Sequence, residues 1–88
     1  MPTRKTNLVK QKKNIIHDII FENIIPNTNS ETFWELSMLT QEIRKHNIDM
    51  QIRINKYDVK KVMNKLTTKR KDISLHLINN NLYFKFLS

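Results

Sequence analysis

The sequence predicts one α+β domain in which three helices are combined with a small antiparallel sheet that ends in a C-terminal β-hairpin. Apolar residues recur at the period of a helix in three segments, and they alternate with polar residues, as in a strand, near the C-terminus. The chain has 88 residues, of which 39% are hydrophobic. This length and composition suffice for one hydrophobic core and are too small for two domains.

The first predicted helix spans residues 13–25. Its apolar positions follow the helical period and are Ile15, Ile16, Ile19 and Ile20. It ends before Pro26, because proline disfavours the helical conformation in the residue that precedes it. Residues 1–12 lack a consistent apolar stripe, since Lys12 would fall among the apolar positions of a helical wheel. We therefore predict a flexible basic arm over residues 1–12 and a folded domain over residues 13–88.

The segment after the first helix allows two interpretations. In one, Thr32 and Glu35 form a capping box and start a helix. In the other, residues 32–36 form a short strand, and Ser37 caps a second helix that ends near His46. We favour the strand, because the two adjacent aromatic residues of this segment point to different sides of any helix.

The third predicted helix spans residues 56–70 and is the most strongly patterned. Asn55 precedes it and is a good N-cap residue. Its apolar stripe consists of Val59, Val62, Met63 and Leu66. The connection before it, residues 47–55, alternates apolar and polar side chains, which favours an extended segment that adds a strand to the sheet.

Two alternating segments end the chain and predict a hairpin over residues 73–87. Between them lie Asn79, Asn80 and Asn81. Asparagine is the non-glycine residue that best tolerates the left-handed conformations of a tight turn. We therefore place the tip of the hairpin at these asparagines.

The chain contains no glycine and no cysteine, which excludes several functional classes. Phosphate-binding loops, dinucleotide-binding turns and the nucleophile elbow of hydrolases all need glycine. Without cysteine there is no disulfide, thiolate nucleophile or cysteine-based metal site. The histidines, His17, His46 and His76, are too widely spaced for a metal-binding motif. No paired carboxylates or nucleophile–base pair stands out, so we expect no enzyme activity, no cofactor and no metal.

The formal net charge of +8 comes from two segments. Residues 1–13 hold five basic residues and no acidic residue, and residues 56–71 hold seven basic residues and one acidic residue. Such clustering is typical of proteins that bind a phosphate backbone. We expect the first segment to contact phosphates through Arg4, Lys5, Lys12 and Lys13.

The third predicted helix also carries a polar face opposite its apolar stripe. Helical spacing places on or beside this face Tyr57, Lys60, Lys61, Asn64, Thr68 and Lys71. Lysines there can contact phosphates or guanine, and an asparagine amide can form two hydrogen bonds with adenine. We predict that this face binds nucleic acid, although many lysine-rich helix faces are simply solvated.

The order of these elements resembles that of the winged helix-turn-helix superfamily: helix, short strand, helix, basic helix and terminal two-stranded hairpin. The resemblance covers residues 13–88 and implies that the helix 56–70 is a recognition helix. It also implies that the hairpin 73–87 is a wing, with Asn80 at its tip. The function implied is a double-stranded DNA-binding module in transcriptional regulation or genome organisation. One departure is the connection 47–55, which is longer than the usual turn of a helix-turn-helix.

A narrower branch of that superfamily, the Zα domains that bind left-handed nucleic acid, is similar in the spacing from Val59 to Leu66. That branch expects Asn and Tyr on its recognition helix, where this chain has Lys60 and Asn64. We therefore do not expect binding to the left-handed form.

Duplex DNA is the expected partner, and a homodimer is compatible because winged helices often pair. The alternatives are a protein-interaction subunit of a transcription complex, which would bind an acidic protein, and an RNA-binding protein. No hydrophobic stretch approaches the roughly 20 residues of a membrane span, so we expect no membrane contact and an intracellular location where DNA is present. Lys, Asn and Ile make up 35 of the 88 residues, a bias typical of AT-rich genomes, viral ones included.

Overall fold

The computed structural model describes residues 4–49 and 51–87 and shows an α+β chain. Its three α-helices are accompanied by a three-stranded antiparallel sheet, which confirms the predicted class. Along the chain the elements are α1 (Arg4–Ile19), η1 (Ile20–Ile24), η2 (Ile25–Asn27), β1 (Phe33–Glu35), α2 (Leu36–His46), α3 (Lys56–Lys69), β2 (Ile73–Ile78) and β3 (Asn81–Phe86).

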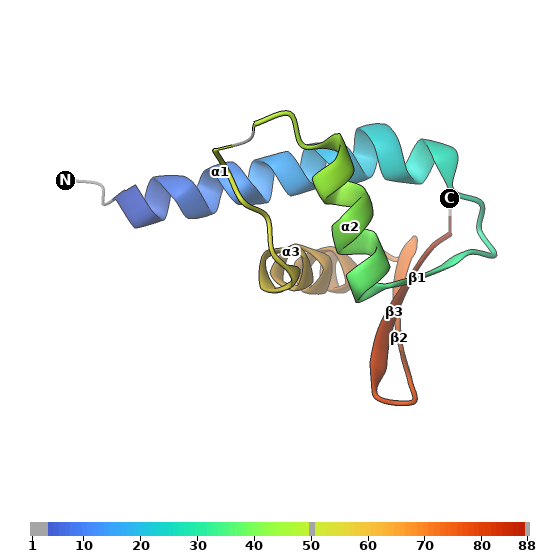
Figure 1. Cartoon of the computed structure of the whole chain (residues 1–88). Helices are drawn as coiled ribbons and strands as arrows, with labels where there is room; N and C mark the ends of the chain where they lie inside the picture. The colour runs from blue at the N-terminus through green and yellow to red at the C-terminus, as the bar shows by residue number, and fades with distance from the viewer. Residues whose placement is uncertain (1–3, 50, 88) are drawn as a thin grey trace.

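The predicted arm over residues 1–12 needs correction, because α1 already begins at Arg4 (Figure 1). Residues 1–3 lie outside the described residues. The lysine that interrupts the apolar stripe has a partner: the Lys12 ammonium lies 3.3 Å from the Asp58 carboxylate of α3. This ion pair compensates the charge of Lys12 on the side of the helix that faces the domain. The helix can therefore include Lys12 without interruption.

The first helical segment also ends later than predicted. After Ile19 the chain continues as the π-helix η1 and then as the short 3-10 helix η2, which ends at Asn27. Pro26 lies in the first turn of η2, where its missing N–H costs no hydrogen bond. The buried side chains Ile20 and Ile24 keep the segment packed against the core.

The short strand before the second helix is confirmed as β1, but the predicted cap is wrong. Helix α2 begins at Leu36 and not after Ser37; Glu35 takes the N-cap position without a side-chain hydrogen bond. Leu36 is buried in the core, so packing holds the first turn where capping does not. The helix ends at His46, as predicted.

The strand predicted within residues 47–55 is wrong for the residues that the structure describes, which form an irregular loop. Side chains bind the backbone here: the Asn47 amide donates to the carbonyls of Asp49 and Ile52, and the Asp49 carboxylate accepts from the Gln51 N–H. Such local bonds compete with a strand ladder. Ile54 is buried, whereas Ile48 is 92% exposed, so the alternation does not mark two faces of a sheet. Met50 lies outside the described residues.

Helix α3 matches its prediction closely. The Asn55 side chain accepts from the Asp58 N–H at 3.1 Å, and the Asp58 carboxylate accepts from the Asn55 N–H at 3.0 Å, which together form a capping box. The predicted apolar stripe is buried and consists of Val59, Val62, Met63 and Leu66. The side of α3 opposite this stripe therefore does not contribute to the core.

The sheet has the strand order β1-β3-β2, so β3 is central. Phe84 of β3 pairs with Trp34 of β1 and with Leu75 of β2. The Phe84 ring is fully buried, and the Trp34 indole packs against the core while its Nε1 donates to Thr28 Oγ1 at 3.2 Å. These residues fasten the hairpin to the helical part of the domain.

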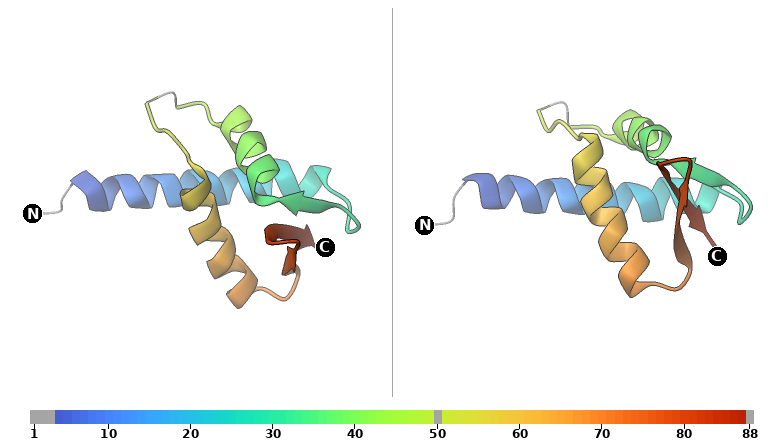
Figure 2. Two further views of the ribbon diagram at one scale, coloured as in Figure 1. Left: turned by 60° about the horizontal axis from the view of Figure 1, so that its bottom comes forward. Right: turned by 90° about the horizontal axis from the view of Figure 1, so that it is seen from below.

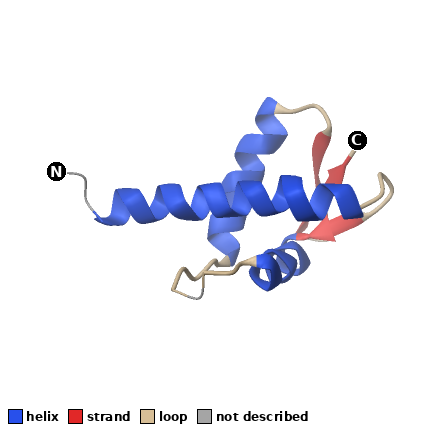
Figure 3. Cartoon of the chain, turned by 90° about the horizontal axis from the view of Figure 1, so that it is seen from above, coloured by secondary structure: helices blue, strands red, loops and turns tan. Residues whose placement is uncertain are grey.

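The helices and the hairpin are arranged so that two parts project from the domain. Helix α1 crosses over α3, as the view from above shows (Figure 3), whereas α2 lies to one side of α1; the N-terminal half of α1 extends past both. The β2–β3 hairpin extends away from α1, toward the bottom of the view in Figure 1, and passes the level of α3. The exposed surface of α3 thus lies between the projecting half of α1 and the hairpin.

The hairpin turn gives a first prediction. Asn79 and Asn80 have φ angles of 51° and 67°, and the flanking pair Ile78–Asn81 closes a two-residue turn of the type that needs positive φ at both positions. We expect Asn80→Val to cost about 1–2 kcal/mol of unfolding free energy, because a β-branched residue is strained there, and Asn80→Gly to cost nothing. Urea unfolding of both variants checks this; equal stability would contradict it.

Candidate nucleic-acid interface

The side of α3 opposite the core is uncovered. Seen from below, no other element crosses in front of this helix (Figure 2). The Tyr57 side chain is 75% exposed, and the other predicted residues of this face are exposed as well: Lys60, Lys61, Asn64 and Thr68. The structure therefore brings these five residues together on one open surface, which we call the α3 face.

The polar groups of the α3 face differ in what they already bind. The Thr68 hydroxyl donates a hydrogen bond to the main-chain carbonyl of Asn64 at 2.8 Å, and the hydroxyl oxygen of Thr68 can still accept a hydrogen bond. Within the described part of the chain, the Asn64 side-chain amide has no hydrogen-bond partner. Asn64 can therefore offer both its donor and its acceptor to a ligand.

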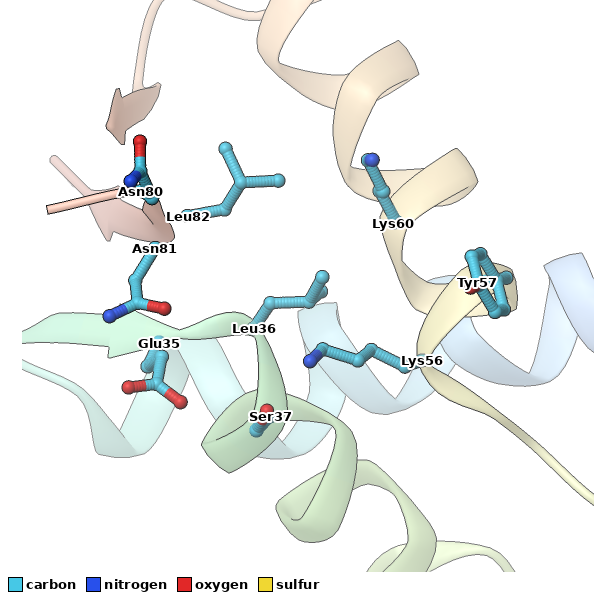
Figure 4. A pocket seen from close by; sticks show the side chains of 9 residues that line it. All are labelled: Glu35, Leu36, Ser37, Lys56, Tyr57, Lys60, Asn80, Asn81 and Leu82. Carbon is cyan, nitrogen blue, oxygen red and sulfur yellow. The ribbon is translucent and has the colours of Figure 1, made fainter. Parts of the chain in front are cut away.

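A cleft separates the start of α3 from the hairpin tip (Figure 4). Lys56, Tyr57 and Lys60 line it from α3, and Asn80 lines it from the turn. The remaining lining residues come from β1, α2 and β3 and are Glu35, Leu36, Ser37, Asn81 and Leu82. The cleft holds two lysines against one carboxylate, so the tip and the helix face a common positively charged space.

The opposite flank of α3 meets helix α1. Lys13 of α1 lies beside Lys65 and Lys69 of α3 in a cleft that also contains Asn14 and His17. The pKa of Lys13 is lowered, first by the positive charge of Lys65, then by burial, and further by the charge of Lys69. The two α3 lysines did not figure in the sequence-based prediction, although their spacing of four residues, continued from Lys61, marks a row along one helix flank.

The remaining predicted contacts have mixed outcomes. Lys12 pairs with Asp58 and its side chain is only 19% exposed, so it is a structural lysine and not an open phosphate contact. Lys71 is exposed but lies in the turn after α3, not on the helix. Arg4 and Lys5 lie in α1, and their side chains fall outside the described part of the structure.

An ion pair fixes the junction between α3 and the hairpin. The Arg70 guanidinium donates from Nε and Nη2 to the two Asp72 carboxylate oxygens at 2.9 and 2.8 Å. It also lies 4.7 Å from the centre of the Phe21 ring. Arg70 is therefore occupied by the fold, unlike the lysines of the α3 face.

This pair predicts a pH effect. The hydrogen bond from Arg70 lowers the pKa of Asp72 below its ordinary value, and the positive charge of Arg70 adds to the effect. A lowered pKa in the folded state means that the ionised carboxylate stabilises the fold above the unfolded pKa. That stabilisation is lost as the pH falls through the folded pKa. We expect NMR titration to show Asp72 ionising at lower pH than in Arg70→Gln; identical titration curves would contradict the pair.

The outer face of the sheet carries an aromatic cluster. The Phe33 ring packs edge-on against His76 at 5.2 Å and Tyr83 at 6.5 Å between centroids, and the Lys85 ammonium lies 4.9 Å from the centre of the Phe33 ring. The cluster joins all three strands. Its aromatic rings pack on one another, which stiffens the base of the hairpin.

Metal and membrane sites are not seen in residues 4–49 and 51–87. No three histidine or carboxylate side chains gather there in a way that could hold a metal ion. None of the helices in these residues has both the length and the apolar content to cross a bilayer.

No family model matches the chain, and searches of curated proteins and of solved structures likewise find no match. The α3 face and its surroundings are therefore the features of this chain that indicate a function.

Proposed function

We propose that the chain is a double-stranded DNA-binding module with winged-helix architecture, in which α3 is the recognition helix and the β2–β3 hairpin is the wing. The observation that carries the proposal is the uncovered α3 face, where Lys60, Lys61 and Asn64 stand together with the hairpin tip alongside. The role that we propose for this surface is transcriptional regulation or genome organisation.

The dimensions of the two partners support this assignment. A helix with its side chains is about 10–12 Å across, and the major groove of DNA is about 12 Å wide. With α3 in the groove, Lys60 and Lys61 reach phosphates or guanine, and the open amide of Asn64 reaches base edges. The hairpin tip at Asn80 then lies beside the groove, next to the sugar–phosphate backbone.

A mobility-shift competition at two ionic strengths tests the proposal, with random duplex DNA, single-stranded DNA and duplex RNA as competitors. About six phosphate contacts give a slope near −5 for the logarithm of the binding constant against the logarithm of the salt concentration. Duplex DNA should compete best. A binding constant that does not change with salt would overturn the proposal, and preference for RNA would assign the α3 face to RNA instead.

Asn64 provides a prediction about sequence selectivity. We expect Asn64→Ala to remove about 1–3 kcal/mol of discrimination between duplex sequences, because a bidentate contact to adenine would be lost. Nonspecific affinity should change little, since the side chain carries no charge. Gln41→Ala, an exposed amide deletion on α2, is the control. Equal weakening on every sequence would show that Asn64 does not read bases.

A further inference from the structure

Three lysines from two helices meet in one cleft, which we call the lysine cleft: Lys13 from α1, and Lys65 and Lys69 from α3. The cleft has a volume of about 310 Å³, with Val62 and Leu66 among its lining residues. Its polar lining is completed by Asn14 and His17, which can donate hydrogen bonds. The lining therefore presents cations and donors around an apolar floor.

Among the described residues, no acidic residue lines the lysine cleft, although the Asp18 carboxylate lies 4.0 Å from Nδ1 of His17. In the described part of the chain, none of its three lysines forms an ion pair. The nearby carboxylate of Asp58 is already bound by Lys12 and by the Asn55 N–H. The lowered pKa of Lys13 reports the same imbalance, because neighbouring positive charges oppose its protonation.

Helical geometry places the lysine cleft on the flank of α3 away from the hairpin. Lys56 lines the cleft between the start of α3 and the hairpin tip, which we call the hairpin cleft, and Lys65 lines the lysine cleft. Nine residues of an α-helix correspond to about two and a half turns, so these side chains leave the helix on opposite sides. Between them lies the α3 face. The two clefts therefore border this face on both flanks.

We infer that the lysine cleft binds backbone phosphates of duplex DNA, on the strand that borders the groove on the α1 side of α3. The inference rests on the proposed function and adds a second phosphate contact region to it. A helix in the major groove has a phosphate backbone on each flank, and the hairpin serves one of them. Lys13 and Lys65 serve the other, with Asn14 and His17 as further donors. Bound phosphate also removes the repulsion among the three ammonium groups.

The test compares two double variants that remove the same charge. Lys13→Gln with Lys65→Gln removes two of the three lysines of the lysine cleft, and Lys45→Gln with Arg53→Gln removes two exposed basic residues that line neither cleft. For each variant the affinity for duplex DNA is measured across a range of salt concentrations. For the cleft variant, we expect the slope of log binding constant against log salt concentration to become less negative by about 2. We also expect its affinity near 0.1 M salt to fall by about 10- to 100-fold. The control should keep most of both.

A second readout separates binding from structure. Without DNA and at low salt, the cleft variant should melt at a higher temperature than the wild type, because like charges are removed. Lysines with a structural role would instead lower the melting temperature when removed. Phosphate ethylation interference on the wild-type complex should show contacts on both strands that flank the groove, and the cleft variant should lose those on one strand.

The outcomes distinguish this inference from the proposed function. If the wild type binds duplex DNA and the cleft variant keeps the full salt slope, the lysine cleft does not bind the backbone, while the proposed function stands. If the wild type does not bind duplex DNA, both are wrong. Inorganic phosphate alone is the remaining arm: NMR shifts of Asn14 and His17 with phosphate but not with duplex would assign the cleft to free phosphate and overturn the inference.

Discussion

Reversing two charges on the α3 face should nearly abolish duplex binding. Lys60→Glu together with Lys61→Glu removes two phosphate contacts and puts two carboxylates against the DNA backbone. Each lost contact lowers affinity about tenfold near 0.1 M salt, and the added repulsion increases the loss, so we expect at least a 1000-fold decrease. Fluorescence anisotropy with a labelled duplex at several salt concentrations measures the effect.

The control for this prediction carries the same change in net charge. Lys45→Glu with Arg53→Glu places the new carboxylates on α2 and in the loop that follows it. This variant should bind DNA less tightly only through the reduced overall charge, by about tenfold or less. Lys60 and Lys61 are exposed, so their reversal should leave the melting temperature nearly unchanged. If both variants lost affinity equally, the α3 face would not be the binding surface.

The parts of the fold that the sequence predicted well are those in which local signals agree. For α3, the Asn55 cap and the apolar stripe from Val59 to Leu66 point to the same helix with the same inward side. For the hairpin, alternation on both strands agrees with the asparagines at the turn. When cap, period and turn chemistry agree, little else can compete. The residues that helical spacing places opposite the apolar stripe of α3 are exposed in the structure.

The parts that failed depend on partners far away in the sequence. Lys12 looked like an interruption of the first helix, because nothing nearby shows that Asp58 will lie 3.3 Å from it. The prediction for residues 47–55 failed for a different reason: the alternating pattern is present, but Asn47 and Asp49 bind the local backbone, and in the described part of the chain no strand pairs with this segment. Periodicity reports which side chains are apolar, not whether a neighbouring strand exists.

The candidate site shows the same division. Residues of the α3 face could be found on one helical wheel, since they share one element. The lysine cleft could not, because Lys13 and Lys65 come from different helices, and only the packing of α1 against α3 brings them together. The projecting half of α1, interpreted from sequence as a flexible arm, is in the structure part of one continuous helix that begins at Arg4 (Figure 1).

Phe84→Ala should produce the largest loss of stability and should disturb the hairpin as well. Phe84 is 0% exposed, lies in the central strand, and pairs with Trp34 and Leu75 on either side. Removing its ring leaves a cavity and costs about 3–5 kcal/mol, a large part of the roughly 5–15 kcal/mol that stabilises a small domain. For a chain of this length we expect the melting temperature to fall by about 15 °C or more, measured by circular dichroism.

Leu77→Ala is the matched control for Phe84→Ala, because Leu77 lies in the same hairpin but is 68% exposed, so its truncation should cost less than about 1 kcal/mol. The comparison also bears on the proposed function. Since Phe84 joins β1 to the hairpin, its loss should weaken duplex binding even at temperatures where the helices remain folded, whereas Leu77→Ala should bind as the wild type does. A Phe84→Ala variant that melts within a few degrees of the wild type would show that the central strand does not hold the hairpin against the helices.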